Sequence, residues 1–197
     1  MNKLFLIPVL LFSLLLGTSS YSADFDKGVD AYNNGDFATA LKEFKLLAEQ
    51  GMAEAQSNLG FMYDNGLGVP QDDKEAVRLY RLAAEQGHVE AQYNLGVMHR
   101  NGQGVPQNYK EAARLYRLAA EQGNAFAQGN LGTMYAFGNG VLKDYVYAHM
   151  WGNIASMNGN DKGALLRDDF AEKMTSSQIE EAQRLARECV KKNYKGC

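Results

Sequence analysis

The sequence predicts an all-α protein, a solenoid of stacked helix pairs. The strongest observation is a duplication: residues 52–87 recur at 88–123 with 26 of 36 positions identical. A further copy starts at 124 and keeps the 36-residue offset through Asn130-Leu131-Gly132. Apolar residues inside each copy follow a helical period. A repeat of this length buries its apolar face only against its neighbours, so the copies stack.

The first residues have the composition of a secretory signal. Lys3 supplies a positive charge, Leu4–Leu16 is an apolar stretch of 13 residues, and Ser20–Ala23 ends in small residues. This stretch is too short for a bilayer span, which takes roughly 20 residues. We therefore expect a cleaved signal peptide over 1–23, a periplasmic or secreted mature protein, and no membrane span.

Charge argues against a nucleic-acid partner. The chain has 20 basic and 23 acidic residues, a formal net charge of −3. Removing Lys3 with the signal leaves 19 basic and 23 acidic residues, a net charge of −4. Acids and bases alternate along the expected helices, which is typical of a solvated helical face.

The mature chain divides into repeat units and two ends. We expect an N-terminal tetratricopeptide-like capping repeat at 24–51, repeats at 52–87, 88–123 and 124–159, and a C-terminal helical cap at 160–197. Within the cap, Asp161–Lys173 and Thr175 to about Asn193 are expected helices, and Thr175 with Gln178 has the spacing of a capping box. Solenoids need such polar ends to stay soluble.

Each full unit is expected to be helix, loop, helix. The first helix carries an apolar stripe at i, i+4, i+7 and i+8, namely Ala55, Leu59, Met62 and Tyr63. The second carries Ala76, Leu79, Tyr80 and Ala83. Glycines and Pro70 in the loop 66–70 stop the first helix, and the N-caps of the second helices are expected at Asp72, Asn108 and Asp144.

These residues carry a family resemblance. The pattern Ala55-x-x-x-Leu59-Gly60-x-x-Tyr63-x-x-Gly66-x-Gly68-Val69, followed by Ala76, Tyr80, Ala83-Ala84 and Gly87, resembles the Sel-one-like repeat family of the tetratricopeptide-like superfamily. The resemblance implies a right-handed superhelix of antiparallel helix pairs that binds a protein or extended peptide on its concave side. The fourth unit departs from the pattern, because Gly152 stands where Tyr80 and Tyr116 stand. Trp151 and Met150 are the expected substitutes for the missing volume.

One face of the first helices varies between copies that otherwise match. Its positions lie at i, i+4 and i+7, and they read Ser57, Phe61 and Asp64, then Tyr93, Val97 and Arg100, then Gly129, Thr133 and Ala136. A position that changes freely is expected to lie outside the core. We therefore predict that this face is the ligand surface. Tyr93 and Phe137 are its expected aromatic anchors.

An asparagine on the same face does not vary: Asn58, Asn94 and Asn130 recur every 36 residues. The equivalent asparagine of tetratricopeptide proteins resembles a ladder that grips the backbone of an extended peptide, since an amide both donates and accepts. Helix-to-helix hydrogen bonding and a by-product of duplication remain the alternatives. If the asparagines form such a ladder, the variable residues beside them determine which peptide sequence binds.

Catalytic patterns are mostly absent, so we expect neither enzyme activity nor a cofactor or metal. His88, His99 and His149 form no H-E-x-x-H arrangement, and the chain has no C-x-x-C pair and no Ser-x-x-Lys. A cysteine-rich branch of the repeat family is associated with penicillin binding and weak β-lactamase activity, but it carries a cysteine pair inside each repeat. The other alternative is an envelope structural or assembly protein. We expect a monomeric binding module.

Cys189 and Cys197 are the two cysteines of the chain. In a continuous helix their Cα atoms would be about 12 Å apart, beyond the limit of about 7 Å for a disulfide. Asn193 and Gly196 allow the tail to leave the helix and fold back. In an oxidising compartment we expect a structural disulfide, with free or intermolecular thiols as the alternative.

Overall fold

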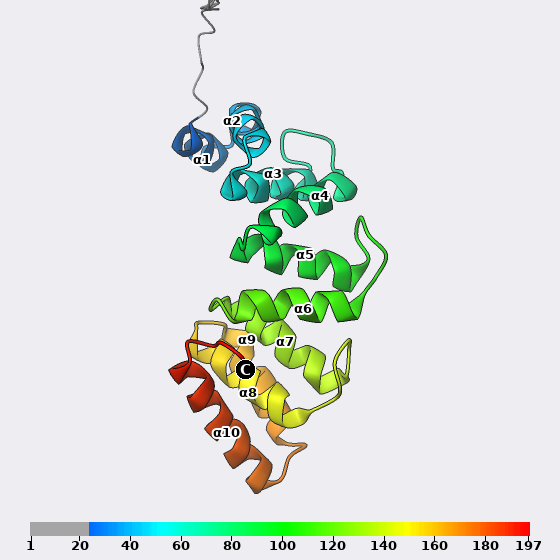
Figure 1. Cartoon of the computed structure of the whole chain (residues 1–197), viewed down its shortest axis with the longest axis vertical. Helices are drawn as coiled ribbons and strands as arrows, with labels where there is room; N and C mark the ends of the chain where they lie inside the picture. Colours follow the sequence, from blue (N-terminus) through cyan, green and yellow to red (C-terminus); the bar gives the residue numbers. More distant parts are fainter. Residues whose placement is uncertain (1–23) are drawn as a thin grey trace, which may run out of the picture.

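The computed structural model describes residues 24–197, and the expected signal peptide lies outside them. The described chain is all helical, as predicted (Figure 1). Its helices are α1 Phe25–Asn33, α2 Phe37–Glu49, α3 Ala53–Asn65, α4 Asp73–Glu85, α5 Val89–Asn101, α6 Tyr109–Ala120, α7 Ala125–Phe137, α8 Tyr145–Met157, α9 Asp161–Ala171 and α10 Ser176–Lys191.

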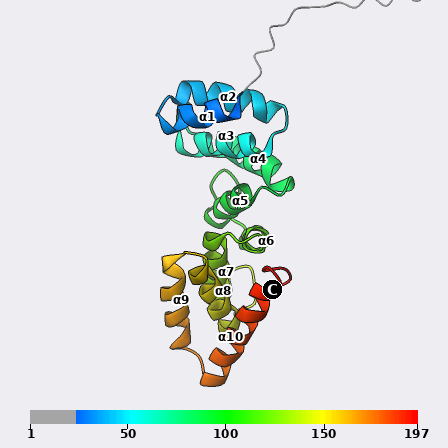
Figure 2. The ribbon, with the colours of Figure 1, turned by 90° about the vertical axis from the view of Figure 1, so that its left-hand side faces the viewer.

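Successive helices pair into hairpins that stack along one axis (Figures 1 and 2). The hairpins are α1 with α2, α3 with α4, α5 with α6 and α7 with α8, and each second helix packs on the first helix of the next hairpin. Residues 36 apart therefore occupy equivalent places, and are called equivalent below. No helix among residues 24–197 is long and apolar enough to cross a membrane.

The helix ends follow the local chemistry expected from the sequence. Asp72, Asn108 and Asp144 each accept hydrogen bonds from backbone N–H groups in the first turn of the helix that follows. Thr175 and Gln178 form the capping box of α10. Each full-length first helix ends on a glycine in the left-handed region, at Gly66, Gly102 and Gly138.

A large aromatic ring sits against a glycine inside each of the first three hairpins. The rings of Tyr80 and Tyr116 are fully buried. A Cβ on Gly96 would lie 2.8 Å from the Tyr116 ring, and one on Gly60 would lie 3.0 Å from the Tyr80 ring. The glycine therefore makes the space that the tyrosine of its partner helix fills.

The fourth hairpin replaces this arrangement. Trp151 and Met150 are buried, as expected, but the space beside Gly152 is taken by the backbone of α9. A Cβ on Gly152 would lie 3.1 Å from the Arg167 nitrogen, and one on Gly163 would lie 2.6 Å from the Ser156 nitrogen. The two glycines let α8 and α9 approach each other closely, so a tyrosine at 152 would not fit.

Buried glutamines tie each repeat to the one before it. Gln92 is 4% exposed; its Nε2 donates to the Ala84 carbonyl oxygen at 3.3 Å, and its Oε1 accepts from Gln122 Nε2 at 2.8 Å. Equivalent bonds join Gln56 to Ala48 and Gln86, and Gln128 to Ala120 and Asn158. The amide thus links the end of one second helix to its own hairpin, and it recurs at every junction between full repeats.

The two helices of the C-terminal cap lie on opposite sides of α8 (Figure 2). Asn160, equivalent to Asn124, caps α9 and donates to the Ala125 carbonyl oxygen at 3.0 Å, so α9 occupies the place of a next first helix. By contrast α10 folds back along α8, and its Ala186 and Cys189 join an apolar cluster with residues of α6, α7 and α8.

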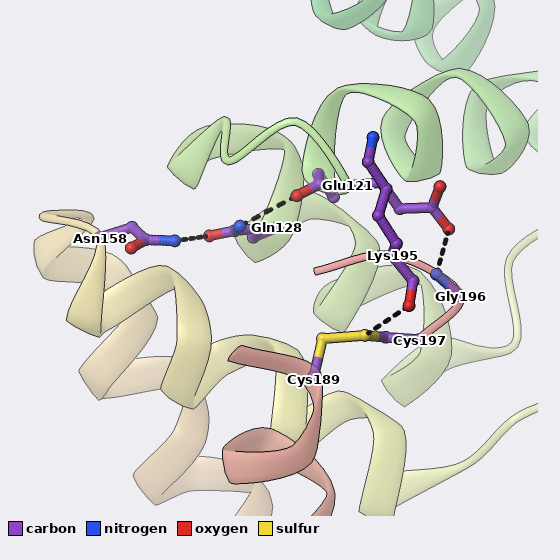
Figure 3. Close-up of a disulfide and its surroundings, with 8 residues drawn as sticks. Glu121, Gln128, Asn158, Cys189, Lys195, Gly196 and Cys197 are labelled. Carbon is purple, nitrogen blue, oxygen red and sulfur yellow. Dashed lines mark hydrogen bonds between the residues drawn. A yellow bond between two sulfur atoms is a disulfide. The ribbon is translucent and has the colours of Figure 1, made fainter. Parts of the chain in front are cut away.

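The tail beyond α10 is held by the expected disulfide (Figure 3). Cys189 and Cys197 are bonded, with their Cα atoms 5.6 Å apart. Asn193 and Tyr194 take positive φ angles, which turns the chain back. The Tyr194 hydroxyl donates to Asn158 Oδ1 at 2.9 Å, and the Gly196 N–H donates to Glu121 Oε1 at 3.3 Å. The tail is therefore anchored to the ends of α6 and α8.

The buried glutamines Gln56, Gln92 and Gln128, which we call the glutamine ladder, generate a stability prediction. Replacing Gln92 with Leu keeps the volume but removes its hydrogen bonds to the half-buried Ala84 carbonyl and to the Gln122 amide. We expect the free energy of unfolding to fall by about 1–3 kcal/mol. Urea denaturation followed by circular dichroism measures it. Exposed Gln71, changed to Leu, is the control and should shift stability by less than about 0.5 kcal/mol. Equal effects of the two changes would contradict the ladder's role.

The second loop glycine of each repeat generates another stability prediction. Gly104 has a φ of +66°, and a Cβ there would lie 2.2 Å from the Asp73 carbonyl oxygen at the start of α4. Gly104→Ala should therefore destabilise the fold by about 2–4 kcal/mol, the sum of left-handed strain and overpacking. Gly87→Ala is the matched control, because Gly87 has a φ of +90° and open space around it. That control should cost only about 1 kcal/mol.

Candidate functional site

The variable positions of α3, α5 and α7 lie on one side of the stack, which we call the first-helix face. Phe61 is 40% exposed and Phe137 is 67% exposed. Five others are half-buried: Asp64, Tyr93, Val97, Arg100 and Thr133. The asparagines Asn58, Asn94 and Asn130 are also half-buried. These residues therefore leave polar and aromatic groups within reach of a ligand.

Three variable positions do not fit the idea that changing residues lie outside the core, because Ser57, Gly129 and Ala136 are buried. A Cβ on Gly129 would lie 2.9 Å from Asn160 Nδ2, at the start of α9. Ala136 packs with Phe170 of α9 in one apolar cluster. The reason is that neighbouring first helices pack side by side, so part of the variable face lies between repeats. We correct the expectation at these positions.

The N-terminal end of the face holds an apolar pocket of about 250 Å³ between α1 and α3. Its wall includes Tyr32, Phe44, Asn58 and Phe61. The rings of Tyr32 and Phe61 meet edge to face, with centroids 6.4 Å apart. Asn58 thus places one amide at the rim of a pocket suited to an apolar side chain.

Aromatic rings also cluster between α5 and α7. The Tyr93 ring lies 6.0 Å from Tyr116 and 6.2 Å from Phe126. Phe126 is 62% exposed, so this cluster presents an apolar edge to solvent. Val97 and Tyr93 pack against the core cluster beneath it. The Tyr93 side chain therefore packs against the core and also remains partly accessible to a ligand.

Two of the recurring asparagines, Asn94 and Asn130, lie beside buried tyrosine hydroxyls of the preceding repeat. The hydroxyl groups of Tyr80 and Tyr116 are buried and make no hydrogen bond. Burial raises the pKa of Tyr80 far above its usual range; Asp64 raises it further, and Asn94 lowers it. These two groups lie close enough to shift the Tyr80 pKa without reaching hydrogen-bonding geometry. In this arrangement the Asn94 amide can hydrogen-bond either to the Tyr80 hydroxyl or to a ligand.

The next junction repeats this arrangement with the opposite charge. Burial raises the pKa of Tyr116, and both Arg100 and Asn130 lower it. Arg100 is equivalent to Asp64, so an acid in one repeat is replaced by a base in the next. The Asp64 carboxyl has its pKa raised, first by burial and then by the charge of Asp73. Along the face, an apolar pocket, an acidic position and a basic position therefore follow one another.

Sequence reasoning missed several parts of this face. Tyr32 and Phe126 lie in the aromatic clusters although neither belongs to the variable set. The recurrence of Gln56, Gln92 and Gln128 was as regular as that of the asparagines. That recurrence could have identified the glutamines as structural, because a buried amide that repeats needs a repeating partner.

His88 and His149 lie in local structural settings. His88 caps α5 by accepting from the Ala91 N–H at 3.2 Å. His149 is buried on α8, and burial lowers its pKa. Within residues 24–197, no group of three or more His, Cys, Asp or Glu side chains is placed to hold a metal ion.

Comparison with known proteins gives a family and several relatives. The Sel1 repeat matches residues 53–88, 89–124 and 125–160. An exopolysaccharide production negative regulator of Rhizobium leguminosarum bv. viciae is 36% identical over 75 residues, covering 36% of this chain and 28% of that protein. This chain therefore spans less than a third of that curated relative.

Two solved structures have the same fold. A Sel1 repeat protein from Oxalobacter formigenes superposes with a TM-score of 0.66 at 29% identity, covering 87% of this chain and 78% of that one. The protective antigen c5321 of uropathogenic Escherichia coli strains, described as having an SLR fold, superposes with a TM-score of 0.60 at 30% identity, covering 80% of this chain and 42% of that one. These matches confirm the predicted solenoid and the family resemblance.

The unpartnered tyrosine hydroxyls generate a stability prediction. Tyr80→Phe removes a buried hydroxyl that makes no hydrogen bond, so stability should stay the same or rise by about 1 kcal/mol. Tyr135→Phe is the contrasting control, because the Tyr135 hydroxyl accepts from Arg117 at 2.6 Å. Its loss should cost about 1 kcal/mol. A clear destabilisation by Tyr80→Phe in thermal unfolding would show that the Tyr80 hydroxyl has a partner.

Proposed function

Because this chain belongs to the Sel1 repeat family, whose repeats mediate protein–protein interaction, we propose that it is an exported scaffold that binds an extended peptide on its first-helix face. The observation that carries the proposal is the order of groups on that face. An apolar pocket at Phe61 is followed by the acidic Asp64 and then by the basic Arg100. Neighbouring repeats with otherwise matching sequences thus present different side chains to a ligand.

The asparagines supply the part of the proposal that does not depend on side-chain identity. Asn58, Asn94 and Asn130 are half-buried and recur at each repeat. A carboxamide donates and accepts at once, as a peptide bond does, so repeated amides suit an extended backbone. Phe61, Tyr93, Val97, Arg100, Thr133 and Phe137 then select the bound side chains.

Export and a non-enzymatic role complete the proposal. The Cys189–Cys197 disulfide suits an oxidising compartment, and the expected signal peptide would deliver the chain there. Sel1 repeats generally serve as non-enzymatic scaffolds. Both cysteines lie outside the matched repeats, unlike those of the cysteine-rich branch linked to β-lactamase activity. We propose that the protein works as a monomer.

The internal repeats allow a charge-exchange test. The double variant Asp64→Arg with Arg100→Asp keeps the composition and net charge but reverses the order of charges along the face. Panning a phage library of random peptides against wild type should enrich sequences with a basic residue on one side of an acidic one. The variant should enrich the opposite order, and each pool should bind the other protein on the order of tenfold more weakly.

The measurement is the charge order in sequenced pools, with affinities from fluorescence anisotropy. Lys110→Glu with Glu180→Lys is a control exchange of exposed charges away from the face, and it should leave the selected pools unchanged. Identical pools from wild type and the Asp64/Arg100 variant would contradict the proposed surface.

A further inference from the structure

A second surface runs along the opposite side of the stack, between consecutive second helices. We call the space between α4 and α6, floored by α5, the outer groove. It has a volume of about 610 Å³, and its floor is formed by Gln92, Leu95 and His99. An equivalent groove of about 300 Å³ lies between α2 and α4, with Tyr63 in the place of His99. Stacking thus produces one such groove at each junction.

At the next junction, the equivalent groove is filled by the chain's own α10. Ala186 and Cys189 pack in one cluster with Ala120, Met150 and Ile154, the residues equivalent to Ala84, Arg114 and Leu118 of the outer groove. The tail closes over the same end through Gly196 and Glu121 (Figure 3), and Glu121 is equivalent to Glu85. The molecule itself therefore shows that this groove accepts an amphipathic helix with a stripe of small residues.

The outer groove keeps an apolar strip for such a helix. Leu95 and Leu115 are buried beneath it, and Leu118 on its wall remains 37% exposed. Within residues 24–197, α4 packs mainly on α3 and α5, and α6 on α5 and α7, so no further helix covers this groove as α10 covers α8. Glu111 and Arg114 face each other on α6, with Arg114 Nε donating to Glu111 Oε2 at 2.9 Å. The wall is consequently more polar than the one that α10 covers.

The outer groove and the groove at the α10 junction differ at one pair of polar residues. At the junction that α10 closes, the exposed Arg117 donates to the Tyr135 hydroxyl at 2.6 Å. The equivalent pair in the outer groove is Arg81 and His99. The His99 Nδ1 is buried without a hydrogen-bond partner, and the Arg81 side chain makes no hydrogen bond or ion pair in the described chain. The Arg81 guanidinium is therefore left in the groove where a carboxylate would pair with it.

The charges around His99 fit the same conclusion. Burial lowers the pKa of His99, and Arg81 and Arg114 lower it further while Glu111 raises it. Burial thus favours the neutral form of the imidazole over the charged one. Glu111 is already engaged by Arg114, and Glu85 lies on the rim of the groove. Arg81 is thus the cation available to an incoming acid.

We propose that the outer groove is a second docking site, which takes an amphipathic helix of a partner protein whose small-residue stripe is flanked by one Asp or Glu that pairs with Arg81. The helix lies as α10 lies at the next junction. Binding there is separate from binding on the first-helix face, so the scaffold holds two different segments at once.

The test uses a displayed library of helical peptides with the α10 stripe, residues equivalent to Ile179, Ala182 and Ala186, and randomised flanking positions. Selection on wild type should enrich Asp or Glu at one flanking position. Arg81→Gln and His99→Tyr should each weaken the enriched peptides by roughly 10- to 100-fold, the effect of losing a hydrogen bond to a charged group. His99→Tyr gives Arg81 the partner that Tyr135 gives Arg117, so the variant should fold normally while its Arg81 is already engaged.

Lys45→Gln is the matched control, since Lys45 is equivalent to Arg81 in the neighbouring groove. It should leave the affinities unchanged, as should the Asp64/Arg100 exchange on the other face. Equal binding by wild type, Arg81→Gln and His99→Tyr would overturn the proposal. A dimer in light scattering that Arg81→Gln dissociates would also overturn it, because the occupant would then be a second copy of this chain.

Discussion

The structure depends on the contact between successive repeats, and the buried glutamines are its polar part. Each hairpin of about 36 residues is too small to enclose a core of its own. Gln56, Gln92 and Gln128 each bond a carbonyl of the preceding second helix and accept an amide from their own hairpin. A buried amide left without these partners would cost free energy, so the ladder fixes how far one repeat is displaced from the next.

This fixed stacking leaves two sides of the molecule with different properties. First helices pack side by side, which covers Ser57 and Gly129 but leaves Phe61 and Arg100 within reach of solvent. Between consecutive second helices, grooves remain above Leu95 and its equivalent Leu59. Both surfaces follow from one repeated geometry, and their chemistry differs only through a few substitutions, such as Asp64 for Arg100 and Tyr63 for His99.

The C-terminal cap ends the solenoid by using both surfaces. On one side, α9 continues the row of first helices and covers Ala136 with Phe170. On the other, α10 fills the last outer groove, and the Cys189–Cys197 disulfide holds its tail against Glu121. The wall beneath α10 has Met150 and Tyr147 where the open groove has Arg114 and Glu111. The sequence of a groove therefore reflects whether the chain itself occupies it.

The sequence alone determined the helices, their caps and the repeat, because these depend on neighbouring residues and on a duplication visible within one chain. It also indicated that the tail returns to Cys189, since Asn193 and Gly196 permit the turn. Only the tertiary structure decided which variable positions are buried, because the burial of Ser57 and Ala136 depends on helices from the adjoining unit. The same holds for the place of α10, since its apolar stripe fits any complementary groove and carries no information about which one. Periodicity shows that a face is buried; the segment that covers it is set by packing between residues far apart in the chain.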